Sequence, residues 1–155
     1  MKERSRSMPA SVRLLIFLLV FLGLNAIAAG GAFILAPDGR LIQMPLSNLK
    51  NSPFTDFLIP GILLFLFVGV YPFLVAYSLW KQPSWRWPEA INPFKGMHWS
   101  WAGSLAAGVA LVIWITVQVQ WITFGVLHAI FLVYGIVVLA VTLLPGVRRY
   151  CGRKS

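Results

Sequence analysis

Four long apolar runs constrain the fold of this chain more than any other feature, and they lie at about residues 12–36, 54–80, 99–119 and 121–144. An α-helix rises about 1.5 Å per residue, so roughly 20 apolar residues cross the hydrocarbon core of a bilayer. Only 11% of the residues are charged and 59% are hydrophobic, whereas a soluble domain carries about a quarter charged residues. The sequence therefore predicts an all-α fold, in which residues 1–155 form a single transmembrane domain, an up-down bundle of four helices.

The first apolar run has two interpretations. Basic residues precede it, and Ala26-Ile27-Ala28 matches the small-residue cleavage pattern of a secretory signal peptide. The apolar stretch continues beyond this pattern to Ala36, however, and a cleaved signal does not need that extension. We therefore expect a retained helix, with cleavage of helix 1 as the alternative.

The positive charges predict the orientation of the bundle. The first loop holds only Arg40 and Lys50, and the turn between the third and fourth runs holds no Lys or Arg. The other eleven basic residues lie at the two termini and in the second loop: Lys2, Arg4, Arg6, Arg13, Lys81, Arg86, Lys95, Arg148, Arg149, Arg153 and Lys154. Because cytoplasmic loops carry the excess of Lys and Arg, both termini are predicted to be cytoplasmic. The net charge of +9 thus reflects topology, and we expect no nucleic-acid partner.

The two longer loops are predicted to lie at the membrane surfaces. Residues 37–53 alternate apolar and polar side chains after a Pro37-Asp38-Gly39 turn, which indicates an interfacial segment on the outer side. Residues 81–98 form a cytoplasmic loop rich in Trp and Pro, and its prolines exclude a long helix. Indole rings favour the headgroup region. The expected interface anchors are Trp80, Trp85, Trp87, Trp99 and Trp101.

The start of the second run carries an acid between two prolines, in the segment SPFTDFLIPG. Ser52 is placed as a helix N-cap with Pro53 at the first helical position, where its missing N–H costs nothing. Pro60 and Pro72 would then lie inside the helix, and each is expected to kink it. Asp56 would sit on the turn that Pro60 loosens.

Small and polar residues at helical spacing predict which faces of the helices pack together, because helices in lipid associate through such residues. The second run has no clean stripe of this kind, so we expect it to lie less centrally. The predicted stripes are Ser11, Leu18, Asn25, Ala28, Ala29, Ala32 and Ala36 on the first helix, Ser100, Ser104, Ala107, Leu111 and Gln118 on the third, and Gly125, His128, Leu132, Gly135 and Thr142 on the fourth.

Four polar residues within the runs form the candidate site. Asp56, Gln118 and His128 are predicted at the same outer depth, and Asn25 lies nearer the middle of the membrane. Polar and ionisable side chains inside a bilayer are costly, so each is a candidate for function. A carboxylate beside an imidazole could transfer protons. The alternatives are that these residues only join helices, or that Asp56 only stabilises a helix N-terminus.

No cofactor and no metal site are expected. His98 and His128 are predicted near opposite faces of the membrane, which excludes a haem held by both. The single cysteine, Cys151, cannot form an internal disulfide and is expected to be a free thiol.

The segment MPLSNLKNSPFTDFLIPGILLF at residues 44–65 resembles a group of small bacterial integral membrane proteins of about this length, and LLPGVRRY at 143–150 has a similar character. The activity of that group is uncharacterised, so the resemblance implies no role for any residue. It implies four predicted transmembrane helices in a bacterial inner membrane.

Three functions remain open from the sequence. The favoured one is a non-catalytic subunit or scaffold that packs with other membrane proteins or with copies of itself in the lipid bilayer. The second is a small-molecule or lipid binder or transporter that uses the outer polar site. The third is a membrane enzyme that uses Asp56 and His128 as acid and base.

Overall fold

A computed structural model describes residues 7–153, whose regular elements are all helices, with no β-strand among them. Four helices are long and apolar enough to cross a membrane. They are α1 (Ala10–Leu35), the composite helix formed by α2 (Leu58–Leu63), the π-helix η3 (Leu64–Val70) and α3 (Tyr71–Lys81), then α5 (Trp99–Gln118), and α6 (Val126–Leu143). The shorter elements are η1 (Arg40–Ile42), η2 (Leu46–Leu49), α4 (Arg86–Ile91) and α7 (Pro145–Cys151).

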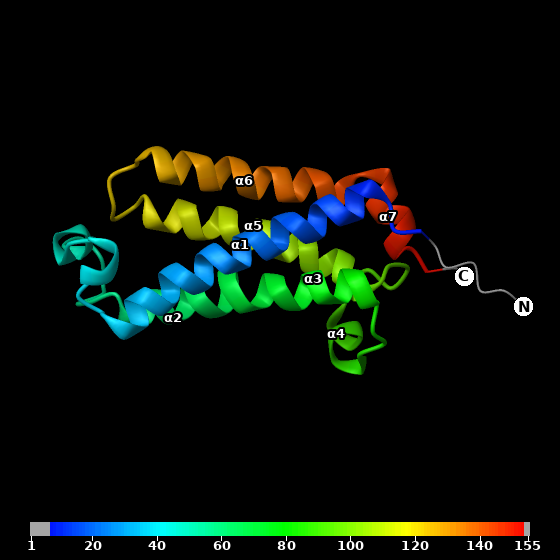
Figure 1. Cartoon of the computed structure of the whole chain (residues 1–155), viewed down its shortest axis with the longest axis horizontal. Coiled ribbons are helices and arrows are strands. Elements are labelled where there is room, and N and C mark those ends of the chain that lie inside the picture. The colour runs from blue at the N-terminus through cyan, green and yellow to red at the C-terminus, as the bar shows by residue number, and fades with distance from the viewer. Residues whose placement is uncertain (1–6, 154–155) are drawn as a thin grey trace, which may run out of the picture.

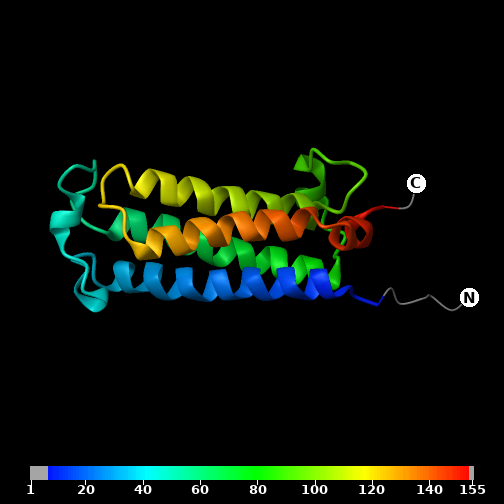
Figure 2. The same ribbon diagram turned by 90° about the horizontal axis from the view of Figure 1, so that it is seen from above.

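The four long helices run alternately up and down (Figure 1). We call the end that holds the start of α1 and the whole of α7 the terminal end. The opposite end, formed by residues 36–57 and 119–125, is the distal end (Figure 2). The all-α fold with four membrane-length helices is therefore confirmed.

The second long helix begins four residues later than the sequence suggested. Residues 54–57 form turns, and the helix starts at Leu58 rather than Phe54. Ser52 Oγ accepts the N–H of Phe54 at 3.2 Å, so it closes a local turn and is not the N-cap. Pro60 is consequently the third helical residue, where an N–H has no helical acceptor anyway. The expected kink at Pro60 loses its physical basis.

The helix accommodates Pro72 by a change of helix type. Seven residues, Leu64–Val70, adopt a π-helix, and the N–H of Tyr71 bonds to the carbonyl of Leu66, five residues earlier. Such π-segments commonly interrupt α-helices where the regular bonding pattern is disturbed. Pro72 then stands as the second residue of α3, near the junction of the two helix types. A bend at Pro72 stays a prediction.

The fourth long helix also begins late, at Val126 instead of residue 121. The third helix ends at Gln118, and residues 119–125 form a turn followed by extended chain. Gly125 is extended, with φ −129° and ψ 175°, and this conformation sets the helix start. The connection is thus longer than the short turn expected between runs that end at about residue 119 and begin at about residue 121.

All four long helices share one apolar core in the terminal half. Its members come from α1, α3, α5, α6 and α7: Val12, Leu15, Leu19, Val75, Ala76, Leu79, Trp99, Trp101, Ala107, Val138, Val141, Val147 and Cys151. Two hydrogen bonds between residues far apart in the sequence connect helices in this core. Tyr134 Oη donates to the carbonyl of Leu18 at 2.6 Å, and Tyr71 Oη donates to that of Gly103 at 3.1 Å.

Close contacts at glycines hold the helices in two pairs, α1 with α2 and α5 with α6, which we call the glycine-fastened pairs. A Cβ added to Gly30 would lie 2.8 Å from the carbonyl oxygen of Gly61, so α1 and α2 touch through their backbones. A Cβ on Gly108 would lie 2.8 Å from Leu139 and 3.3 Å from the carbonyl of Gly135, so α5 and α6 are equally close. The second helix is therefore packed tightly through Gly61, contrary to expectation.

The small-residue stripes were predicted correctly on one helix and wrongly on another. On α5, Ser100, Ser104, Ala107 and Leu111 are all buried. On α1, by contrast, Asn25 and Ala28 are exposed. The buried face of α1 lies at Val12, Leu15, Leu19, Leu22, Gly23, Ala26, Gly30 and Phe33.

Two of the expected interface anchors belong to the core. Trp99 and Trp101 are each only 7% exposed, and Trp101 Nε1 donates to the carbonyl of Thr142 at 3.0 Å. Their rings are enclosed by protein, so they cannot reach lipid headgroups. Trp80, Trp85 and Trp87 remain exposed.

Candidate functional site: a distal apolar cavity

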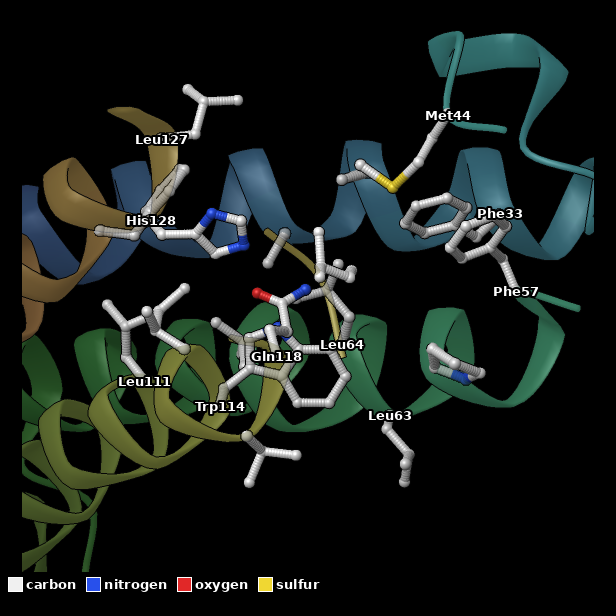
Figure 3. A pocket seen from close by; sticks show the side chains of 18 of the residues that line it. Phe33, Met44, Phe57, Leu63, Leu64, Leu111, Trp114, Gln118, Leu127 and His128 are labelled. Carbon is white, nitrogen blue, oxygen red and sulfur yellow. The ribbon is translucent and has the colours of Figure 1, made fainter. Parts of the chain in front are cut away.

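A cavity of about 390 Å³ lies in the distal half of the bundle. The long helices supply most of its wall, and the connecting segments at residues 42–57 and 121–122 supply the rest (Figure 3). It is lined by Leu22, Asn25, Ala26, Ala29, Phe33, Ile42, Met44, Leu49, Phe54, Phe57, Pro60, Leu63, Leu64, Val68, Leu111, Trp114, Ile115, Val117, Gln118, Trp121, Ile122, Leu127, His128 and Phe131. This volume falls in the range of small-molecule sites, about 300–1,000 Å³.

The two glycine-fastened pairs account for the position of the cavity. In the distal half α1 is held against α2, and α5 is held against α6 at the middle of both helices. Between the pairs, a second core cluster of Leu22, Ala26, Val68, Leu111 and Ile115 ends the solid packing and lines the cavity. The cavity lies between this cluster and the distal end.

The first loop closes part of the distal end. Leu49 and Phe57 pack with Phe33 in a small core, and the rings of Phe33 and Phe57 stack with centroids 4.6 Å apart. Phe54 meets Trp121 edge to face at 6.1 Å, which joins the two connecting segments. The loop of residues 37–53 thus contributes cavity wall, whereas its exposed side chains, such as Leu41, face away from the protein.

Three of the four predicted polar residues line this cavity: Asn25, Gln118 and His128. The Gln118 amide and the His128 ring point into the same space (Figure 3). Within residues 7–153, the structure gives the Gln118 side chain no hydrogen-bond partner. Asn25 donates to the carbonyl of Phe21 at 2.8 Å, which is a bond within its own helix. The amide and imidazole are therefore the groups available to a ligand.

The imidazole of His128 is oriented by the start of its own helix. The N–H of Gly125 donates to Nδ1 at 3.1 Å, and the Phe124 ring stacks on the imidazole with centroids 5.9 Å apart. Because Nδ1 accepts this hydrogen bond, the neutral ring carries its hydrogen on Nε2. Nε2–H has no partner among the side chains that the structure describes.

Asp56, the fourth predicted residue, lies outside the cavity wall. Its Oδ1 accepts the N–H of Leu58 at 2.9 Å, the first N–H of α2. A carboxylate at this place satisfies an unpaired helix donor and interacts favourably with the helix dipole. The structure thus supports the capping alternative for Asp56. It shows no hydrogen bond or ion pair between Asp56 and His128 in the described chain.

Sequence reasoning missed the aromatic walls of the site. Trp114, Trp121 and Phe131 line the cavity, together with Phe33, Phe54 and Phe57. One signal was available, because Trp114, Gln118 and Trp121 recur at helical spacing and place two indoles beside the amide. The contribution of Met44 and Leu49 had no such signal, since it depends on how the loop folds back.

A buried polar cluster lies at the terminal end, distant from the cavity along the helices. His98 Nδ1 and Ser100 Oγ are 2.8 Å apart, and His98 Nε2 is 3.1 Å from the carbonyl of Pro83. Cys151 is free, as expected, and its Sγ lies 4.0 Å from Ser100 Oγ. Burial raises the pKa of this thiol to about 11, with the Ser100 hydrogen bond opposing the shift. The thiol is accordingly unreactive at neutral pH.

This cluster fixes the second loop and α7 to each other. The N–H of His98 donates to the carbonyl of Cys151 at 2.7 Å, and Arg153 forms an ion pair of 2.6 Å with Glu89. Glu89 also accepts the N–H of Trp99 at 2.7 Å. These contacts give the cluster a structural role.

The part of the chain that the structure describes holds no group of three or more His, Cys, Asp or Glu residues that could bind a metal ion. Comparison with protein-family models, with curated proteins and with solved structures finds no match to this chain. The site must therefore be interpreted from its own geometry.

Proposed function

We propose that this chain is a multi-pass membrane protein that binds a lipid-like molecule in its distal cavity. The observation that carries the proposal is the cavity itself, about 390 Å³ of space with an almost wholly apolar lining. A cavity of this size is costly to leave open in a bundle core, because unfilled apolar space forfeits packing energy. A hydrocarbon ligand from the bilayer would restore those contacts.

The charge distribution supports an orientation with both termini in the cytoplasm and the distal end outside. Among residues 7–153, Arg40 and Lys50 are the basic residues of the distal loop, and the other seven belong to the terminal side: Arg13, Lys81, Arg86, Lys95, Arg148, Arg149 and Arg153. A bacterial inner membrane fits this asymmetry and the resemblance of residues 44–65. Reporter fusions after residue 155 test it: alkaline phosphatase should be inactive there, and an active fusion would reverse the orientation.

Binding is tested with a pair of adjacent alanines on α1. Ala29 lines the cavity, whereas Ala28 is exposed and does not. The protein and its variants are isolated in native-membrane nanodiscs, and the lipid retained on each chain is counted by native mass spectrometry. Ala29→Phe should lose the retained lipid, and Ala28→Phe should keep it. Equal retention in both variants would contradict the proposed site.

The subunit and the enzyme remain weaker interpretations. The exposed Leu, Ile, Val and Phe side chains of the long helices are what contact with acyl chains requires, so they do not call for a protein partner. The proposed acid–base pair lacks support, because Asp56 caps α2 and only His128 reaches the cavity.

A further inference from the structure

The cavity wall carries no formal charge. None of its 24 residues is Asp, Glu, Lys or Arg, and its polar side chains are Asn25, Gln118, His128 and the two tryptophans. An ionised group moved into such surroundings without a partner is strongly disfavoured. A phosphate, carboxylate or ammonium head therefore has no counter-ion in this site.

The hydrogen-bonding groups select among uncharged heads. Nδ1 of His128 is occupied by the N–H of Gly125 at 3.1 Å, so the ring offers Nε2–H as a donor. The Gln118 amide adds two further N–H donors beside the imidazole (Figure 3). The site thus presents donors to an accepting oxygen.

The size of the cavity limits the rest of the ligand. At about 390 Å³ the cavity lies near the lower end of small-molecule sites, which hold about 300–1,000 Å³. That is room for a small head and part of one chain, and too little for both tails of a bilayer phospholipid. Six aromatic rings in the wall, on Phe33, Phe54, Phe57, Trp114, Trp121 and Phe131, provide flat surfaces for the head.

We infer that the ligand is an uncharged, single-chain lipid whose head presents a carbonyl oxygen to His128 Nε2–H and the Gln118 amide. Isoprenoid quinones and acylglycerols share this chemistry. The inference rests on the proposed lipid-binding function and specifies its ligand class.

The test measures the affinity of purified protein in nanodiscs of phosphatidylcholine for three probes: decylubiquinone, monoolein and oleate at pH 8. Decylubiquinone or monoolein should bind more tightly than oleate, and the tighter of the two identifies the source of the carbonyl. Gln118→Leu should weaken the binding of that probe roughly two- to twelve-fold, because the ligand oxygen loses one of its two donors and keeps only His128 Nε2–H. Gln120→Leu is the control, since Gln120 is exposed and absent from the wall.

A second variant separates loss of the donor from loss of the helix cap. Gln is favoured at the third helical position because its side chain can bond to the N-cap N–H. His128→Gln should retain carbonyl binding, whereas His128→Leu should lose it. Oleate binding as tight as monoolein, or unchanged affinities in Gln118→Leu, would overturn the inferred head while leaving the cavity as a lipid site. If Ala29→Phe leaves every affinity unchanged, the proposed function fails as well.

Discussion

The contact between α1 and α2 gives a sharp prediction at two neighbouring glycines. A Cβ on Gly30 would lie 2.8 Å from the Gly61 carbonyl oxygen, 2.8 Å from the Phe65 nitrogen and 2.9 Å from the Phe65 Cβ. Two of these atoms are backbone, so they cannot rotate away and the helices must separate. A Cβ on Gly31 would meet nothing within 4 Å. Gly30→Ala should therefore disrupt packing, and Gly31→Ala should not.

The expected change in the free energy of unfolding follows from the difference between the two variants. Either replacement adds about 0.5–1 kcal/mol of helix propensity, because both glycines are interior to α1. That contribution cancels when the variants are compared with each other. Overpacking a filled interface costs about 1–3 kcal/mol. Gly30→Ala should thus be about 1–3 kcal/mol less stable than Gly31→Ala.

The assay is reversible unfolding in mixed micelles, with the free energy of unfolding extrapolated to zero denaturing detergent for the wild type and both variants. Gly31→Ala should be equal to the wild type or slightly more stable. If Gly30→Ala proves as stable as Gly31→Ala, the close backbone contact of α1 with α2 is refuted.

Two further predictions concern the terminal end. Trp101→Phe removes the hydrogen bond to the Thr142 carbonyl and should lower the free energy of unfolding by about 1–3 kcal/mol. Trp87→Phe is the control, because this ring is 85% exposed and its replacement should change the free energy of unfolding by less than about 0.5 kcal/mol. Equal effects of the two variants in the same micelle assay would contradict the buried hydrogen bond. Burial raises the pKa of the Cys151 thiol from its ordinary 9.0 to about 11, so as the pH rises the unfolded chain loses this proton before the folded chain does. The contribution of the thiol to the free energy of unfolding is therefore fully present below pH 9, and it should fall by up to about 2–3 kcal/mol between pH 9 and 11. Cys151→Ala should reduce that decline, to which Tyr150 also contributes because burial and Cys151 raise its pKa. A decline unchanged in Cys151→Ala would disprove the assignment.

The sequence was sufficient for the number and approximate extent of the long helices, because hydropathy over 20 residues is a strong and local signal. The predicted first residues of the second and fourth long helices were less accurate. Pro53 and Pro60 are both acceptable near a helix N-terminus, so their pattern does not decide between a start at residue 54 and one at Leu58. The start of α6 depends on the backbone of Gly125, a residue that adopts many conformations.

Helix faces were harder to predict where small residues are abundant. On α1, Ala28, Ala29 and Ala32 suggested the packed face, yet Gly23 and Gly30 mark the contact because only glycine allows backbones to touch. Their seven-residue spacing was the better signal. On α5 the serines and Ala107 coincide with the true face, and the prediction succeeded.

The candidate site was predicted in part. Gln118 and His128 were placed at one depth because both lie near the same ends of neighbouring helices, and the structure places both in the cavity wall. Asp56 was expected to join them, but its side chain satisfies a nearer donor, the N–H of Leu58. Local hydrogen bonds of this kind compete with longer-range contacts and are invisible in residue spacing.

We expect the two glycine-fastened pairs to behave as two stiff arms, joined through the terminal core and meeting at the distal end through the Phe54–Trp121 contact of their connecting segments. The shared core and the polar cluster at the terminal end act as the pivot, and each arm is a unit because its helices touch through backbone. A 20-residue helix is about 30 Å long, so turning one arm by roughly 5° moves its far tip by about 2.6 Å. The gap between the arms therefore widens most at the distal end, and a ligand would enter sideways between the arms, directly from the surrounding lipid.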